Sequence, residues 1–308
     1  MTRAVVFAYH NVGVRCLRTL LDQGVDVALV LTHEDSPTET IWYDSVAQVC
    51  ADHNIEAITV DDPNVTEVIE RVRALAPDFI FSFYYRKMLG SSLLAIPRRG
   101  ALNMHGSLLP KYRGRVPVNW AVLHGESETG ASLHYMEVKP DAGDLVAQTA
   151  VPILGDDTAF EVFQKVTVAA ELTLSRALPQ LIAGTAPSIP LDLKSGSYFS
   201  GRKPEDGRIN WQQSAREVNN LVRAVAPPYP GAFSDNFGVR VVIARARVVV
   251  PPASAAGNAG SIAHVGEKVG ILCGDGKLLE PLATVVDEKT LNAEETRAWL
   301  RRQAGMKQ

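Results

Sequence analysis

The first half of the chain alternates short apolar runs with amphipathic stretches, and this alternation restricts the possible folds more than any other feature. The apolar runs are rich in β-branched and aromatic residues, as buried strands are, and lie at residues 4–8, 25–32, 57–60 and 78–83. Helix-type stretches separate them, at residues 11–24, 45–53 and 65–75. This spacing predicts an α/β domain with a Rossmann-like, mostly parallel sheet. Ligands of such sheets bind beyond the carboxyl ends of the strands, so functional residues are expected there.

The remaining sequence predicts further strands and then a smaller second domain. Strand-type runs at residues 131–136 and 146–153 precede a helix-type stretch at 158–182. The following stretch is rich in Gly, Pro and Ser, as linkers are. Beyond it, short β runs with Gly and Pro turns favour a C-terminal β-barrel-like domain of the OB type. We therefore predict a catalytic domain, a linker and an OB-like domain at residues 1–189, 190–204 and 205–308.

Charge and cysteine content exclude several classes of protein. A formal net charge of −3 argues against binding to nucleic acid through phosphates. Cys16, Cys50 and Cys273 form no CxxC pair, so the sequence predicts neither a disulfide framework nor a metal site. No apolar run reaches the length of a bilayer span, and the N-terminus lacks the apolar core of a signal peptide. We expect a cytoplasmic protein that acts on a small molecule, without nucleic acid or membrane partners.

The segment ALNMHGSLLPKYRGRVPVNW, residues 101–120, carries the strongest candidate chemistry. Asn103 and His105 alternate along a predicted strand, so both side chains point to one face. An amide donor beside an imidazole is able to bind a developing oxyanion and to move a proton. Asp141, in the turn KPDAGD, is placed to pair with His105 and favour its protonated form. Each of these residues alone is more often structural, so the hypothesis depends on the combination.

The motif NMHGSLLPKYRGRVP, together with the later DAGD, resembles the signature of the N10-formyltetrahydrofolate-dependent formyltransferases. That family includes methionyl-tRNA formyltransferase, glycinamide ribonucleotide formyltransferase and several sugar-nucleotide enzymes. The resemblance implies transfer of a formyl group from the folate to an amine, without a metal. It also implies that Asn103 stabilises the oxyanion, that His105 transfers the proton, and that Asp141 raises the pKa of the histidine.

Further segments, among them FAYHNVG, FSFYYRKML, ETGASLHYM, GRKPEDGRINW and RAVAPPYPGAF, are similar to one branch of this family. That branch comprises the formyltransferase portions of bifunctional polymyxin-resistance enzymes, which formylate UDP-4-amino-4-deoxy-L-arabinose on the route to modified lipid A. The resemblance implies that formyl-folate is held largely by backbone, at Lys87, Met88, Leu89, Glu137, Val138, Lys139 and Pro140, with Arg115 beside them. Those enzymes continue into an NAD-dependent decarboxylase, whereas this sequence stops at Gln308. We therefore expect the decarboxylase on a separate chain, and a monomer or weak dimer.

Other residues receive weaker assignments. Four polar residues near the predicted strand ends are candidates for the acceptor pocket, namely Tyr84, Arg86, Arg113 and Asn119. Three histidines lack any motif and are interpreted as structural, namely His124, His134 and His264.

The sequence leaves the exact function open. Methionyl-tRNA formylation would need a basic surface, but residues 33–44 contain four acidic and no basic residues. From residue 205 onward, 13 Lys or Arg stand against 11 Asp or Glu. The sequence is also compatible with a formyltransferase for a different nucleotide sugar and with a non-catalytic folate-binding module. An oxidoreductase is disfavoured, because the sequence has no GxGxxG turn after a strand.

Overall fold

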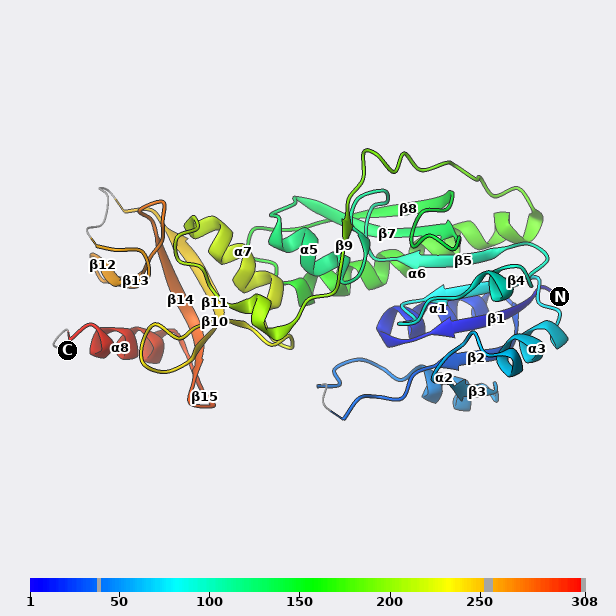
Figure 1. Cartoon of the computed structure of the whole chain (residues 1–308), viewed down its shortest axis with the longest axis horizontal. Helices are drawn as coiled ribbons and strands as arrows, with labels where there is room; N and C mark the ends of the chain where they lie inside the picture. The colour runs from blue at the N-terminus through cyan, green and yellow to red at the C-terminus, as the bar shows by residue number, and fades with distance from the viewer. Residues whose placement is uncertain (38–39, 252–256, 306–308) are drawn as a thin grey trace. The chain divides into compact units, whose positions relative to one another are not determined.

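The computed structural model describes residues 1–37, 40–251 and 257–305 (Figure 1). Two residues of the charge counts above, Glu39 and Lys307, lie outside these ranges. The chain divides into two compact units. The first unit consists of Met1–Pro117, Glu128–Pro152 and Phe163–Ser200, and the second unit of Val118–Ser127, Ile153–Val162 and Gly201–Gln308. The predicted domain boundaries at residues 189 and 204 remain a prediction about which segments fold independently.

The first unit is built on a seven-stranded sheet with the order β3-β2-β1-β4-β5-β7-β8. Its strands are β1 (Arg3–Ala8), β2 (Asp26–Thr32), β3 (Ala57–Thr59), β4 (Phe79–Phe83), β5 (Ala101–His105), β7 (Glu128–Tyr135) and β8 (Leu145–Pro152). The pairs from β3 to β5 are parallel, and the two pairs that involve β7 are antiparallel. The predicted mostly parallel sheet is therefore confirmed.

Helices cover both faces of this sheet, because alternate residues of its central strands are apolar and fully buried on each side. On one face, Val5 of β1 belongs to a core cluster with residues of α3 (Thr66–Ala74) and α4 (Ser91–Leu94). The other face carries α1 (His10–Asp22), where the Cα of Gly13 approaches Ala8 closely enough that a Cβ would lie 3.2 Å from the Ala8 Cβ. Two more helices complete the unit, α2 (Val46–Asp52) and most of α6 (Ala159–Ala183), whose residues before Phe163 belong to the second unit. The guanidinium of Arg15 joins α1 to α6 through an ion pair of 2.6 Å with Glu171.

The second unit contains a six-stranded antiparallel sheet with the order β10-β11-β14-β13-β12, and β15 pairs with β14. Its strands are β10 (Ala232–Ser234), β11 (Val241–Val249), β12 (Ile262–Val265), β13 (Lys268–Leu272), β14 (Leu278–Val286) and β15 (Lys289–Leu291). Its helical elements are η1 (Pro204–Gly207), α7 (Ala215–Val225) and α8 (Ala293–Gln303), and α5 (Pro117–Leu123) lies almost wholly within it. The predicted C-terminal β domain is confirmed as an antiparallel sheet domain.

A small pair of strands, β6 (Arg113–Gly114) and β9 (Tyr198–Phe199), lies outside both sheets. This parallel pair fixes the motif loop after β5 to the stretch that the sequence predicts to be a linker. Among the described residues, no helix is long and apolar enough to cross a membrane.

Candidate active site

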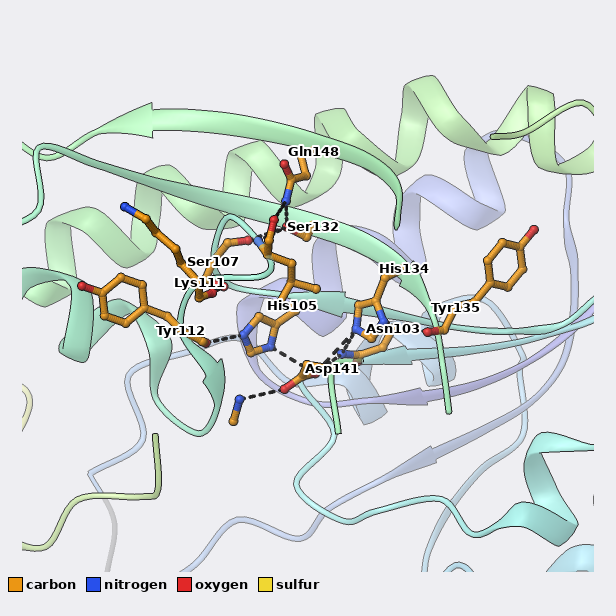
Figure 2. A network of polar contacts seen from close by, with 12 residues as sticks. Asn103, His105, Ser107, Lys111, Tyr112, Ser132, His134, Tyr135, Asp141 and Gln148 are labelled. Carbon is orange, nitrogen blue, oxygen red and sulfur yellow. Dashed lines mark hydrogen bonds and ion pairs between the residues drawn. The ribbon is translucent and has the colours of Figure 1, made fainter. Parts of the chain in front are cut away.

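Strands β5 and β7 present four polar side chains on one face, as Figure 2 shows. Their antiparallel register places Asn103 opposite His134 and His105 opposite Ser132. The intervening residues of β5, Leu102 and Met104, are fully buried apolar side chains. This alternation is the period of two that a strand requires, so the same pattern that buries the strand also aligns the polar pairs.

The Asp141 carboxylate lies at the centre of this group (Figure 2). Its Oδ1 is 3.4 Å from His105 Nδ1 and 3.5 Å from His134 Nε2, and it accepts from Asn103 Nδ2 at 3.4 Å. Its Oδ2 accepts from the Gly114 backbone N–H at 2.8 Å. The structure thus brings together Asn103, His105 and Asp141, which lie up to 38 positions apart in the sequence.

The electrostatic environment keeps Asp141 ionised. Burial by itself would raise the pKa of this carboxyl. The charge of His105, together with the hydrogen bond from the Gly114 N–H, outweighs that effect and holds the pKa of Asp141 well below its usual range. A fixed negative charge therefore sits beside both imidazoles.

The His105 imidazole faces acceptors on both sides. Its Nδ1 faces the Asp141 carboxylate, and its Nε2 lies 2.8 Å from the Tyr112 carbonyl oxygen. A neutral imidazole has one N–H and satisfies only one of these acceptors, whereas an imidazolium satisfies both. The residue is 6% exposed. The geometry therefore holds the His105 ring between two acceptors, one of them the Asp141 carboxylate, in a place sheltered from solvent.

His134 corrects the sequence interpretation, which assigns it a purely structural place. Its Nδ1 lies 2.7 Å from the Tyr135 carbonyl oxygen, so Nδ1 carries the proton. Its Nε2 is then free to accept from Asn103 Nδ2 at 3.1 Å, and this contact orients the amide. The signal was the alternation of Ser132 and His134, which matches that of Asn103 and His105 if the two strands pair antiparallel.

The loop after β5 is tied to the neighbouring strands by buried hydroxyl and amide groups. Ser107 Oγ donates to the Lys111 carbonyl at 2.6 Å, and Ser132 Oγ donates to the Ser107 carbonyl at 2.5 Å. Gln148 Nε2, from β8, donates to the Leu109 carbonyl at 2.7 Å. Each of these three carbonyls is therefore fixed by a side chain of the loop itself or of β7 and β8.

Gly114 allows the backbone to reach Asp141. It has a φ of 97°, and a Cβ at this position would lie 2.1 Å from the Phe199 carbonyl oxygen. Any other residue would clash with β9 or change the backbone. The glycine of the motif thus places its N–H on the Asp141 carboxylate.

The residues that the resemblance assigns to formyl-folate lie in two loops of the first unit. In the first loop, Lys87 turns its ammonium away to the Val60 carbonyl at 2.8 Å, Met88 is exposed and Leu89 is buried. In the second loop, Glu137, Val138 and Lys139 are exposed and Pro140 is half-buried next to Asp141. Arg115 is exposed, and its backbone N–H bonds the Phe199 carbonyl. The Lys87 side chain is therefore engaged within the protein, and only the backbone of this residue is available to a ligand.

The candidates for the acceptor pocket differ in their surroundings. Tyr84 is half-buried after β4 with a φ of 59°, and the Arg86 guanidinium lies 4.7 Å from the centre of the Tyr9 ring. Arg113 is 8% exposed. Among the described residues, nothing accepts a hydrogen bond from its buried Nε, and no carboxylate pairs with it.

Asn119 belongs to the second unit, whereas the other candidates belong to the first. It is buried in the second unit, where its Nδ2 donates to the Ala224 carbonyl at 2.8 Å. This hydrogen bond uses the amide donor of Asn119 to join α5 to α7.

Comparison with known proteins identifies two regions of the chain. The family described as formyl transferase matches residues 4–178, and the formyl transferase C-terminal domain matches residues 202–299.

Three solved structures have the same fold. An N-formyltransferase from Helicobacter canadensis in complex with folinic acid and dTDP-3-aminofucose is 20% identical, with a TM-score of 0.68 over 91% of this chain and 99% of that chain. WlaRD, a sugar 3-N-formyltransferase in the presence of dTDP and 5-N-formyl-THF, is 18% identical, with a TM-score of 0.69 over 94% and 99%. A 4-N-formyltransferase from Francisella tularensis is 19% identical, with a TM-score of 0.61 over 75% and 91%.

Proposed function

The chain belongs to the formyl transferase family, and from this premise we propose that it moves the formyl group of N10-formyltetrahydrofolate to the amine of a nucleotide-linked sugar. The observation that carries the proposal is the contact of one Asp141 oxygen with both His105 Nδ1 and Asn103 Nδ2. The folate ligands and nucleotide sugar of the similar structures support the two substrate classes.

The finer assignment is the 4-amino group of UDP-4-amino-4-deoxy-L-arabinose, which would place the enzyme in lipid A modification and polymyxin resistance. The segments that resemble this branch of the family support it, among them HGSLLPKYRGRVPVNW and RAVAPPYPGAF. The likeness of fold to a 4-N-formyltransferase is compatible with the same position on the sugar.

The proposed mechanism assigns one task to each of three residues. N10-formyltetrahydrofolate supplies an activated formyl carbon, and attack by a neutral amine leaves negative charge on the formyl oxygen. Asn103 Nδ2 donates to that oxygen, and such a donor contributes about 100- to 1,000-fold in rate. His105 gives a proton to the folate nitrogen as the bond from that nitrogen to the formyl carbon breaks, a contribution of about 100- to 10,000-fold. The proton that the amine loses on becoming an amide balances the one that is given. Asp141 keeps that proton on the imidazole by its fixed negative charge.

Two hydrogen bonds within the site must break before Asn103 and His105 can bond to a substrate. Both N–H groups of Asn103 face the site itself, one toward His134 Nε2 at 3.1 Å and one toward Asp141 at 3.4 Å. The second contact is long for a hydrogen bond, so the formyl oxygen would replace the carboxylate as acceptor. His105 Nε2 must likewise leave the Tyr112 carbonyl to reach a substrate. Substrate binding would supply both rearrangements.

Arg113 supports an anionic acceptor. A buried guanidinium without an internal carboxylate partner is costly, and an external anion would compensate its charge. The diphosphate of a nucleotide sugar has the required charge, and guanidinium groups bind phosphate oxygens well. We therefore assign Arg113 to the acceptor and leave Asn119 out of the site.

The test follows the formyl carbon directly. Co-substrate with a carbon-13 label in the formyl group would be mixed with enzyme and UDP-4-amino-4-deoxy-L-arabinose, and the carbon resonance recorded. We expect the label to move from the tertiary amide at N10 of the folate to the secondary amide of the formylated sugar, and His105→Ala to stop this transfer while leaving the fold intact. Label that passes to water instead, or full transfer by His105→Ala, would refute the proposal.

A further inference from the structure

The loop between β4 and α4 is held from behind by the side chain of Asn64. Asn64 Nδ2 donates to the Met88 carbonyl at 3.0 Å, and Asn64 Oδ1 accepts from the Gly90 backbone N–H at 2.6 Å. One primary amide therefore bonds the two backbone groups that flank Leu89. A neighbouring strand would make the same pair of contacts in an antiparallel sheet.

This arrangement turns the backbone of Leu89 away from Asn64. In extended chain, the N–H and C=O of one residue point opposite to those of its neighbours, and Gly90 is extended with φ −76° and ψ 167°. The Leu89 side chain is buried in the core cluster that includes Val68 and Val72. No hydrogen bond joins the Leu89 N–H or C=O to any other of the described residues. Leu89 thus offers an adjacent donor and acceptor to a ligand.

The segment behind this loop, residues 60–64, forms a firm support. The Lys87 ammonium donates to the carbonyls of Val60, at 2.8 Å, and Asp61. Asp62 Oδ1 accepts from both the backbone N–H and the Nδ2 of Asn64, each at 2.9 Å. These contacts fix the Asn64 amide and make residues 60–64 and 87–90 one body.

Gly90 permits the close approach. A Cβ on Gly90 would lie 2.9 Å from Asn64 Oδ1, closer than real Cβ contacts. The missing side chain is therefore what allows Asn64 to reach the backbone of the loop.

We propose that Asn64 is a positioning residue for the formyl-folate site. It does not touch the co-substrate, but it orients the Leu89 N–H and C=O so that they pair with the donor–acceptor edge of the pterin ring. The inference rests on the proposed function, because it needs formyl-folate as the ligand of this loop. It extends that function by assigning part of the affinity for the folate to Asn64. This residue lies 25 positions before Leu89, whose backbone it orients.

The test compares Asn64→Ala, Asn64→Asp and the control Asn210→Ala. Asn210 lies in a loop of the second unit, and its Oδ1 accepts from the Gln212 backbone N–H at 3.1 Å. Folinic acid is the probe, with its Kd measured by calorimetry, and kcat and both KM values are measured with N10-formyltetrahydrofolate. Asn64→Ala loses two hydrogen bonds, so we expect Kd and the folate KM to rise about tenfold. The kcat at saturation and the acceptor KM should stay unchanged, a separation that general destabilisation would not produce.

Asn64→Asp keeps the acceptor for the Gly90 N–H but loses the donor to the Met88 carbonyl, so we expect a smaller rise in Kd than in the Ala variant. This variant decides the question if circular dichroism shows that Asn64→Ala is unfolded. Wild-type affinity for folinic acid in both variants, or an equal loss in Asn210→Ala, would overturn the role of Asn64 while leaving the proposed function intact. Wild-type protein that binds neither folinic acid nor N10-formyltetrahydrofolate would refute the proposed function and this inference with it.

Discussion

Replacing Asp141 with Asn removes the charge at the centre of the site and changes its shape very little. The amide oxygen still accepts from the Gly114 N–H, which bonds the carboxylate at 2.8 Å in the native protein. What is lost is the negative charge 3.4 Å from His105 Nδ1. In the proposed mechanism this charge is the counterion that keeps the transferred proton on the His105 ring, and the variant lacks it.

The structure allows the effects of this substitution on folding stability and on catalytic rate to be estimated. Removing one partner of a buried ion pair costs on the order of 3–5 kcal/mol, and the retained Gly114 contact reduces this to about 2 kcal/mol. Loss of the poised proton should lower kcat/KM about 100- to 10,000-fold. This loss of rate corresponds to about 2.7–5.4 kcal/mol, so the effect on activity exceeds the effect on stability.

The lowered pKa of Asp141 determines how its contribution to folding stability changes with pH. Because the pKa of Asp141 is lower in the folded than in the unfolded protein, its carboxylate stabilises the fold fully above the unfolded value, about 3.9, and this contribution disappears as pH falls through the lower folded value. Asn does not titrate. The contribution of the Asp141 charge to the stability difference between wild type and Asp141→Asn should therefore be fully present above about pH 5 and shrink below about pH 4.

Urea denaturation across this pH range measures the stability difference, and the absorbance change on conversion of N10-formyltetrahydrofolate measures the rate. An Asp141→Asn variant within threefold of wild-type kcat/KM would refute the reasoning. A stability difference that widens as the pH falls would refute the electrostatic part alone.

Three further substitutions separate the roles of neighbouring residues. Asn103→Ala should lower kcat about 100- to 1,000-fold with little change in the folate KM, measured by steady-state kinetics, because the donor acts on charge that develops only during attack. His134→Phe removes the acceptor that orients the Asn103 amide, so kcat should fall about 2- to 10-fold, as expected for the loss of one hydrogen bond. An unchanged kcat would show that the Asn103 amide is oriented without His134. Arg113→Met should raise the acceptor KM about 10- to 100-fold and leave the folate KM unchanged, and a rise in both would contradict its assignment to the acceptor.

Sequence reasoning succeeds where short local patterns dictate the structure. The most apolar runs of the first unit become β1, β2 and β4, because a buried parallel strand has to be apolar on both faces, and the short run at residues 57–60 becomes the edge strand β3. The period of two along residues 103–105 is enough to place the amide and the imidazole on one face. The turn at Asp141, which has a φ of 50°, is also local in origin, since Asp tolerates the left-handed region.

The parts that sequence reasoning misses depend on partners distant in the chain or on local exceptions. His134 enters the site only through the antiparallel register of β7 with β5, which no local pattern specifies. Strand β14 is not predicted because Pro281 lies within it, and proline is unfavourable inside a strand. The structure accommodates Pro281 opposite Ala246, where the register between β11 and β14 shifts. Helix α8 did carry a signal, the capping box between Asn292 and Glu295, which the sequence interpretation overlooks.

The acceptor is the central claim, and a single measurement tests it most directly. The purified protein would be incubated with N10-formyltetrahydrofolate and, separately, with UDP-4-amino-4-deoxy-L-arabinose, other nucleotide-linked amino sugars and methionyl-tRNA. Mass spectrometry would then show which amine gains a formyl group. We predict formylation of UDP-4-amino-4-deoxy-L-arabinose and none of methionyl-tRNA. Formylation of methionyl-tRNA alone, or of no amine while the folate still binds, would contradict the account.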